Sequence, residues 1–191
     1  MNTLVFIRHG ETDMAGRFCG HSDPDLNAAG VGQVSCLAEE IAMLGIERIY
    51  SSDLRRASQT ATAIAQRIGV DTAYVPALRE IHFGLWEGLN WQEIEERFPE
   101  HAARWLCEFP LHRAPGGESY TEFTARIDAV ITPFLEAATA ATIAIVTHRG
   151  VMRYALTKFF DFSEDEAWTK TAPYCATIVA AARTHHCEVL L

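Results

Sequence analysis

The sequence predicts an α/β fold, a three-layer α/β/α sandwich with helices on both faces of a mostly parallel sheet. The alternation of two kinds of segment supports this class. Short apolar runs of strand length alternate with segments whose apolar residues recur at helical spacing. The chain has 191 residues, 49% of them hydrophobic. Because that length is only about 1.3 times a typical domain, we expect residues 1–191 to form one domain.

Three strands are predicted in the first half of the chain. Residues 4–7 form a continuous apolar run, which is typical of a strand buried on both faces. Residues 46–50 and 70–75 are the next two candidates, and Pro76 ends the last of them.

Two amphipathic helices separate these strands. Asn27 is the predicted N-cap of the first helix, and Ser52 or Asp53 that of the second, which ends at Gly69. The inner face of the first would carry Val31, Val34, Ala38 and Ile41. The inner face of the second would carry Leu54, Ala57, Ala61, Ile64 and Ile68.

Residues 84–117 differ from the rest in composition. They are rich in aromatic residues and interrupted by prolines at positions 99, 110 and 115. We expect one short amphipathic helix near residues 91–98 and otherwise irregular chain. Long insertions of this kind usually serve as active-site lids, so we interpret residues 84–117 as a lid.

The second half resumes the alternation of helix and strand. Ser119 and Glu122 form a capping box that opens a helix, and Pro133 is expected to kink or end it. Residues 143–146 are a further buried strand, followed by a helix from about Val151. Residues 176–182 and 188–191 are candidates for a final strand pair. The inner face of the capped helix would carry Tyr120, Phe123, Ile127 and Val130.

Charge and composition exclude several classes of partner. The net charge of −9 argues against nucleic acid and against an anionic membrane surface. No run approaches the 18 or more apolar residues of a membrane span, and no basic stretch precedes the first apolar run, so we expect a cytoplasmic protein. Five cysteines without a C-x-x-C pair fit reduced thiols, most of them small core residues. The eight histidines show no metal-ligand spacing.

Two histidines follow two of the predicted strands. His9 comes directly after the first strand, within Arg8-His9-Gly10, and His148 after the strand at 143–146, within His148-Arg149-Gly150. In open α/β sheets ligands bind at the carboxyl ends of the strands, so these residues are expected to meet across one crevice. The alternative is two unrelated loop histidines, which the repeated context makes less favourable.

Arginines point to an anionic ligand. Of the 16 basic residues only Lys158 and Lys170 are lysines, and Arg is the residue that recognises phosphate or carboxylate in a bidentate manner. Arg55 and Arg56 lie in the first turn of a predicted helix, where a bound anion would turn an unfavourable dipole interaction into a favourable one. We expect Arg55 to be solvated; Arg56 becomes the better candidate only through the family motif described below.

A phosphate monoester fits such a crevice. Positioned cations stabilise the charge of a transferring phosphoryl group, and a neutral imidazole is a suitable nucleophile for it. The departing alkoxide needs a proton donor, for which Glu80, just before the lid, is a candidate.

Five motifs in order resemble a known family. They are Arg8-His9-Gly10-Glu11-Thr12; Ser52-Asp53-Leu54-Arg55-Arg56-Ala57 with Gln59-Thr60; Leu78-Arg79-Glu80 with Gly84-Leu85-Trp86-Glu87-Gly88; Pro115-Gly116-Gly117-Glu118-Ser119; and His148. Together they resemble the histidine phosphatase superfamily, the phosphoglycerate-mutase-like proteins. The resemblance extends from residue 4 to about residue 154, and the ordered set is far more specific than its first motif alone.

The resemblance implies a role for each matching residue. It makes His9 the nucleophile that becomes phosphohistidine, and Glu80 the proton donor. Arg8, Arg56 and His148 would hold the phosphoryl oxygens. Residues implied to line the substrate site are Thr12, Cys19, Gly20, Arg149 and Gly150. The resemblance implies no metal and no cofactor, which agrees with the spacing of the histidines, and the partner would be a small phosphorylated metabolite.

Three departures from the family pattern affect the function. Ala15 stands where the family usually has Asn, and Arg149 where it commonly has Gly, so that a charge able to reach a second anionic group is added. The lid contains no lysine and lacks the bisphosphate-binding residues of the mutases. We therefore expect a phosphomonoester hydrolase and not a mutase. Within the phosphatases, the segments Trp86-Glu87-Gly88-Leu89-Asn90-Trp91, Phe98-Pro99 and Pro115-Gly116-Gly117-Glu118-Ser119 most resemble the α-ribazole phosphatases, which makes α-ribazole 5′-phosphate the candidate substrate. Small broad-specificity phosphatases share much of this pattern.

Two alternatives remain open. One is a phosphoglycerate-mutase-like phosphotransferase. The other is a catalytically idle protein that binds phosphorylated ligands, although both His9 and Glu80 are present. His21 and His82 have no assigned role. The remaining histidines, interpreted as surface residues, are His101, His112, His185 and His186.

Overall fold

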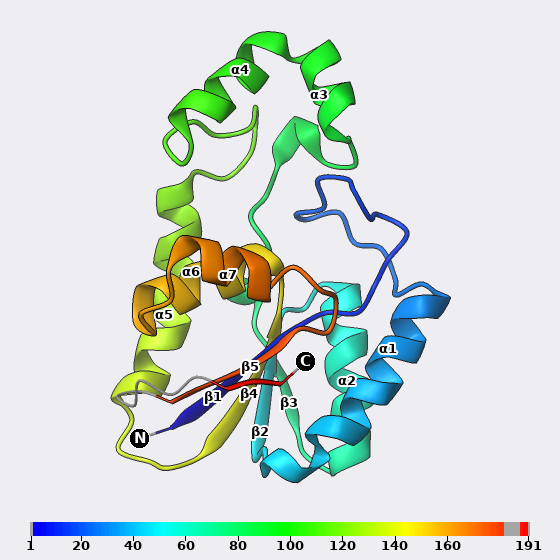
Figure 1. The fold of residues 1–191 in the computed structure, drawn as a ribbon, viewed down its shortest axis with the longest axis vertical. Helices are drawn as coiled ribbons and strands as arrows, with labels where there is room; N and C mark the ends of the chain where they lie inside the picture. The colour runs from blue at the N-terminus through cyan, green and yellow to red at the C-terminus, as the bar shows by residue number, and fades with distance from the viewer. Residues whose placement is uncertain (1, 182–187, 191) are drawn as a thin grey trace.

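A six-stranded sheet forms the centre of the computed structural model, which describes residues 2–181 and 188–190 (Figure 1). The strands are β1 (Thr3–Arg8), β2 (Arg48–Ser51), β3 (Thr72–Tyr74), β4 (Thr142–Thr147), β5 (Thr177–Ala181) and β6 (Glu188–Leu190). Their order is β3-β2-β4-β1-β5-β6. The first four are parallel, whereas β5 runs antiparallel to β1 and β6 antiparallel to β5. The prediction of a mostly parallel sheet is confirmed.

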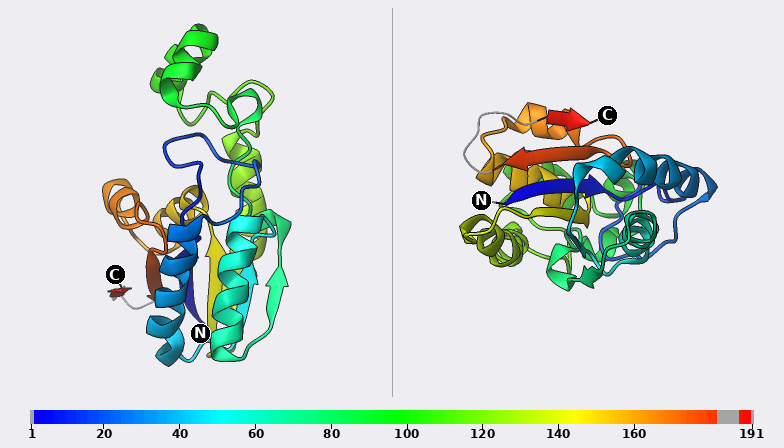
Figure 2. Two further views of the ribbon diagram at one scale, coloured as in Figure 1. Left: turned by 90° about the vertical axis from the view of Figure 1, so that its right-hand side faces the viewer. Right: turned by 90° about the horizontal axis from the view of Figure 1, so that it is seen from below.

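Helices cover both faces of this sheet. The bounds are α1 (Ala28–Glu40), α2 (Arg55–Ile68), α5 (Tyr120–Glu136), α6 (Arg149–Phe159) and α7 (Glu164–Lys170). Helices α1 and α2 pack on one face, and α5, α6 and α7 on the other (Figure 2). The three-layer prediction is therefore confirmed.

Strand β1 shows why the apolar runs are continuous. Successive side chains of a strand point to opposite faces. Val5 and Ile7 accordingly join the core under α1 and α2, whereas Leu4 and Phe6 join the core under α5 and α6. All four side chains are fully buried. Both layers of helices are thus anchored on the strand that precedes His9.

The lid, residues 84–117, projects beyond the carboxyl ends of the parallel strands (Figure 2). It contains the 3₁₀ turn η3 (Gly84–Trp86) and two helices, α3 (Trp91–Arg97) and α4 (Pro99–Glu108). The expectation of a single helix was wrong because Pro99 occupies the first turn of α4, where its missing N–H costs nothing. The lid also has its own small core, in which Trp86, Ile94 and Ala102 are buried.

The ends of several other elements differ from expectation. The N-cap of α2 is Leu54, not Ser52 or Asp53; its side chain makes no capping hydrogen bond, and the carboxylate of Asp23 accepts the amide of Arg55 instead. Helix α5 continues through Pro133 for one more turn, to Glu136. Val31 was expected on the inner face of α1 but is 59% exposed, because Gly30 and Leu37 occupy that face. Helix α7 was not predicted, and two short 3₁₀ turns, η1 (Ile41–Leu44) and η2 (Pro76–Leu78), complete the elements.

The cysteines and histidines required two corrections. Among the described residues no cysteine is fully buried: Cys36 and Cys107 are exposed, and Cys19 and Cys175 are half-buried. His112 was expected at the surface but is buried, and its ring lies 3.1 Å from that of His101, measured from Nε2 to Nδ1. His185, His186 and Cys187 lie outside the described residues.

Two features are absent from residues 2–181 and 188–190. None of the helices in this part combines the length and apolar character needed to cross a membrane. In the same part of the chain, no group of three or more His, Cys, Asp or Glu side chains is arranged to hold a metal ion.

Candidate active site

The carboxyl ends of β1 and β4 bring the two strand-end histidines together. The two strands are parallel neighbours, and Arg8 pairs with Thr147 at their last register position. The residue that follows on each strand is a histidine, so the rings of His9 and His148 lie side by side, with centroids 5.1 Å apart. His9 is 7% exposed and His148 is 1% exposed. The expectation that the strand ends would bring these residues to one place is met.

The ring of His9 is held by the backbone. Its Nδ1 lies 2.7 Å from the carbonyl oxygen of Gly10, which can only accept, so Nδ1 carries the proton and Nε2 has a free lone pair. Burial, together with the nearby charges of Arg56 and Arg8, holds the pKa of His9 well below its usual range. His9 is therefore a neutral imidazole with one unprotonated nitrogen available.

The ring of His148 is held by a serine side chain. Nε2 of His148 lies 2.9 Å from Oγ of Ser52, and the same Oγ accepts a hydrogen bond from the amide of Leu54. The serine hydroxyl can therefore donate to Nε2, and in that tautomer the ring proton is on Nδ1. Nδ1 is buried and has no partner in the protein. Burial and the charge of Arg56 lower the pKa of His148 well below its usual range, in agreement with a neutral ring.

The two arginines of the site are fixed through backbone carbonyls. Arg8 donates to the carbonyl oxygens of Thr171 and Ala172 and stacks on Tyr174, with its Cζ 4.3 Å from the ring centroid. Arg56 is almost completely buried, a rare position for a charged side chain. In both arginines Nε is buried without a partner. Each therefore retains an N–H that a bound anion can accept.

Arg56 binds the loop of residues 19–22, and this loop in turn depends on Glu87. The guanidinium of Arg56 donates to the carbonyl oxygens of Cys19, Gly20 and Ser22 at 2.6–3.1 Å. On the other side of the loop, the carboxylate of Glu87 accepts hydrogen bonds from the amides of residues 20, 21 and 22. These hydrogen bonds keep the pKa of Glu87 low in spite of its burial.

Glu80 is attached to the start of α6. One carboxylate oxygen accepts the amide of Gly150 at 2.9 Å, and the other accepts the amide of Ile81 at 3.0 Å. A Cβ at position 150 would lie 2.3 Å from Oε1 of Glu80, so a larger residue there would displace this carboxylate. Behind Glu80, Arg126 donates to the backbone carbonyls of residues 77, 79 and 80 and pairs with Glu118 at 2.7 Å.

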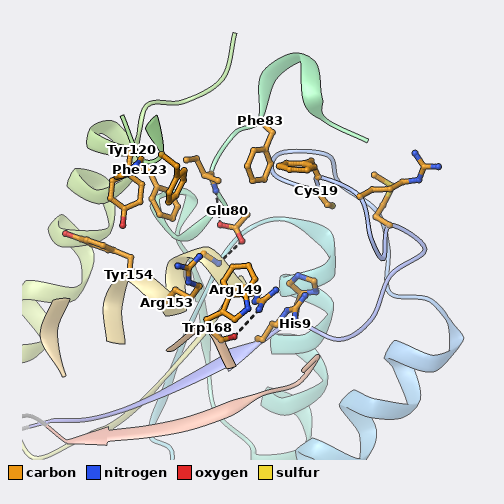
Figure 3. Close-up of a pocket in the computed structure, with 18 of the residues that line it drawn as sticks. His9, Cys19, Glu80, Phe83, Tyr120, Phe123, Arg149, Arg153, Tyr154 and Trp168 are labelled. Atoms are coloured by element: carbon orange, nitrogen blue, oxygen red, sulfur yellow. Dashed lines mark hydrogen bonds between the residues drawn. The ribbon is translucent and has the colours of Figure 1, made fainter. Parts of the chain in front are cut away.

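These groups surround a cavity of about 880 Å³ between the sheet and the lid (Figure 3). Seven of the residues predicted from the sequence line it: Arg8, His9, Thr12, Cys19, Glu80, Arg149 and Gly150. Arg56 and His148 are not part of the lining but lie close enough to His9 to influence its charge or contact its ring. Gly20 is also outside the lining, because its carbonyl binds Arg56 and its amide binds Glu87.

An aromatic wall lies on the lid side of the cavity. We define it as Phe83, Trp105, Phe109, Tyr120 and Phe123, all of which line the cavity. Figure 3 shows Phe83, Tyr120 and Phe123 above Glu80, with His9 and Arg149 below it. The cavity therefore has a polar side formed by the strand ends and an apolar side formed by the lid and the start of α5.

Sequence reasoning missed Ser52, Glu87 and Arg126 as supports of the site. Ser52 was interpreted as a helix cap, and Glu87 and Glu118 appeared only as letters of motifs. Arg126 carried no signal, since an arginine in a helix is usually at the surface. Ala15 is exposed and is not part of the cavity lining.

Comparison with known proteins adds three findings. The family model described as histidine phosphatase superfamily (branch 1) matches residues 4–191. The chain is 31% identical to phosphoserine phosphatase 1 of Hydrogenobacter thermophilus, over 87% of this chain and 84% of that protein. It is 27% identical to the adenosylcobalamin/alpha-ribazole phosphatase of Salmonella typhimurium, over 86% and 83%.

A solved structure has a similar fold. The alpha-ribazole phosphatase from Shigella flexneri has a TM-score of 0.86 and 22% identity, and the match covers 99% of this chain and 95% of that one. At this level of identity the likeness establishes the fold alone.

Proposed function

Because this chain belongs to the histidine phosphatase superfamily, we propose that it hydrolyses phosphomonoesters of small metabolites through a phosphohistidine formed on His9. The observation that carries this proposal is the state of His9. Its Nδ1 proton is held by Gly10, its pKa is lowered, and its Nε2 is free beside the cavity. A neutral nucleophile avoids the repulsion that an anion would meet at a phosphate dianion.

In the first step Nε2 of His9 attacks phosphorus, and the bond between phosphorus and the ester oxygen breaks. The electron pair of that bond stays on the leaving oxygen, which takes a proton from Glu80. Arg8, the free Nε of Arg56 and Nδ1 of His148 are the donors available to the phosphoryl oxygens. Fixed donors of this kind stabilise developing charge without reorganisation.

In the second step water attacks the phosphohistidine. Glu80, now a carboxylate, accepts a proton from this water as the bond between phosphorus and Nε2 breaks. Inorganic phosphate leaves, and His9 is regenerated as the neutral ring. Glu80 is held near the start of α6 by Gly150, and Arg126 fixes the backbone of Glu80.

Two observations bear on the identity of the substrate. The aromatic wall supports the candidate predicted from the sequence, α-ribazole 5′-phosphate, because a flat apolar base can pack against such side chains. The Hydrogenobacter relative is named a phosphoserine phosphatase, and a carboxylate-bearing substrate would suit the positive charge of Arg149. These substrates differ in leaving group, not in the phosphoryl chemistry.

The proposal is tested by trapping the intermediate. Purified protein is mixed with a phosphomonoester labelled in the phosphoryl group, quenched in alkali and digested. We expect a label that is stable to alkali and labile to acid, located on His9 by mass spectrometry. Phosphate release without this label, or a label on another residue, would contradict the mechanism.

The substrate is tested with a panel of phosphomonoesters, including α-ribazole 5′-phosphate, phosphoserine and common sugar phosphates. The α-ribazole assignment is abandoned if that ester is hydrolysed no faster than sugar phosphates. In the same panel, 3-phosphoglycerate is examined for conversion to its 2-isomer, and we expect none. Binding without hydrolysis of any ester would favour the idle alternative.

A further inference from the structure

Arg149 carries a positive charge that the site does not otherwise use. Four arginines line the cavity: Arg8, Arg17, Arg149 and Arg153. Arg17 pairs with Glu93 at 2.8 Å and Arg153 with Glu164 at 3.0 Å. Arg8 faces the proposed phosphoryl position. Among the residues that the structure describes, Arg149 has no carboxylate within salt-bridge distance.

The side chain of Arg149 is nevertheless held in place. Its Cζ lies 3.9 Å from the ring centroid of Trp168, and one terminal nitrogen donates to the carbonyl oxygen of Trp168 at 3.0 Å. Nε of Arg149 is buried and has no partner. Stacking on a ring leaves the edge of the guanidinium free for a planar acceptor. Nε of Arg149 is therefore held in place without a partner.

The surroundings make this charge unfavourable in the empty site. Arg149 is the first residue of α6, where the positive end of the helix dipole opposes a cation. Burial, with the nearby charges of Arg8 and Arg153, lowers the pKa of Arg149, and the charge of Glu80 opposes this shift only in part. A bound anion would offset these unfavourable contributions, because both the guanidinium and the start of the helix favour negative charge.

We propose that Arg149, positioned by Trp168, binds a carboxylate that the substrate carries in addition to its phosphoryl group. The enzyme would then select phosphate esters of hydroxy acids. This inference rests on the proposed function and names the substrate class of the same cavity.

The charge count favours a carboxylate over a second phosphate. Arg149 supplies one uncompensated positive charge, which one carboxylate neutralises, and its planar donors match the two oxygens of that group. A second phosphate would bring nearly two negative charges, yet the neighbouring Arg153 is already paired with Glu164. An uncharged leaving group such as α-ribazole would leave Arg149 without a partner.

The position of Arg149 also fits a short substrate. Arg149 precedes Gly150, whose amide holds the carboxylate of Glu80. Figure 3 shows Arg149 between Glu80 and Trp168, on the same side of the cavity as His9. A carboxylate bound there would lie near the scissile ester and not at the far aromatic wall.

The test uses pairs of esters that differ in one carboxylate. O-phosphoserine is compared with O-phosphoethanolamine, and 3-phosphoglycerate with glycerol 3-phosphate. For the wild-type protein we expect kcat/KM to be about tenfold or more higher for the carboxylate-bearing member, which is the effect of one charge-assisted hydrogen bond. In Arg149→Gln this ratio should approach one, mainly through the loss of the better substrate.

Arg17→Gln is the matched control, because it also removes one arginine from the cavity lining but one that already has a carboxylate partner. The ratio should stay at its wild-type value there. Equal loss on both members of a pair in Arg149→Gln would overturn the inference and assign Arg149 to the phosphoryl group. A wild-type ratio near one would also overturn it. If the wild type hydrolyses no ester, not even p-nitrophenyl phosphate, the proposed function itself has failed.

Discussion

The strand-end side of the cavity and its lid side are built in different ways. On the strand-end side, each functional ring or guanidinium is fixed by a specific hydrogen bond, as Gly10 fixes His9 and Ser52 fixes His148. On the lid side, aromatic rings pack on one another: Trp86 is fully buried, and its ring centroid lies 5.1 Å from that of Trp105.

The difference separates chemistry from recognition. Hydrogen bonds to the backbone fix the position and protonation state of a single atom, which a nucleophile requires. Aromatic packing supplies surface for a leaving group but little control over one atom. We therefore expect substitutions on the strand-end side to lower kcat, and substitutions in the lid to act mainly through KM and local stability.

The largest expected effect comes from His9→Gln. Glutamine keeps polarity and similar size but has no nucleophilic nitrogen, so kcat should fall by at least about a thousandfold, as loss of a catalytic nucleophile does. The phosphoenzyme should be absent in rapid-quench measurements, while the circular dichroism spectrum stays unchanged. A variant that kept a substantial part of the wild-type activity would contradict the assignment of the chemical step to the strand-end side.

Glu80→Gln should produce a smaller and selective loss. Without a proton donor, kcat for alkyl phosphates is expected to fall by about a hundredfold or more. Hydrolysis of p-nitrophenyl phosphate should suffer much less in its first step, because nitrophenolate leaves without protonation. The burst of nitrophenolate in stopped-flow absorbance measures that step. An equal loss of the first step for both esters would indicate that Glu80 holds substrate and does not donate a proton.

The same comparison explains what could be predicted from the sequence. His9 and His148 were found because a strand end is a local signal, and parallel neighbours bring two such ends together whatever the details of packing. The strands and their alternation followed from period and length. These features depend on residues close in sequence.

The supports of the site depend on distant contacts and were missed. Ser52 meets His148 across 96 residues of sequence, and Arg126 reaches the backbone of Glu80 over 46 residues. Arg56 was identified as an anion ligand but not as the anchor of residues 19–22. Its partners there are backbone carbonyls, which every residue has, so the sequence does not indicate which of them bind Arg56. In the lid, Pro99 was interpreted as an interruption although it begins α4.

Trp86→Ala tests the lid side. Removing a fully buried tryptophan from so small a core should lower the free energy of local lid unfolding by about 3–5 kcal/mol. Limited proteolysis within residues 84–117 should accelerate, and KM should rise by about tenfold while phosphoenzyme formation at saturating p-nitrophenyl phosphate is retained. Leu85→Ala is a suitable control, because Leu85 is exposed. A loss of kcat without a change in KM would contradict the division between the two sides.

The smallest effect concerns the pH dependence of stability. Burial lowers the pKa of both His9 and His148 in the folded protein, whereas in the unfolded chain each has a pKa near 6.5. As the pH falls below about 6.5, the unfolded chain therefore binds protons that the folded protein excludes, and stability decreases. The expected slope is about 1.4 kcal/mol per pH unit for each of the two histidines, until the folded-state pKa is reached.

This slope is measured by urea unfolding of wild type, His9→Gln and His148→Gln at a series of pH values between 7.5 and 5. Each substitution should reduce the wild-type slope by the contribution of one proton, because the remaining titrating groups are shared by all three proteins. If the three slopes coincide, the buried histidines of the strand-end side are protonated as readily as those of an unfolded chain, and the neutral state on which the attack by Nε2 depends does not hold.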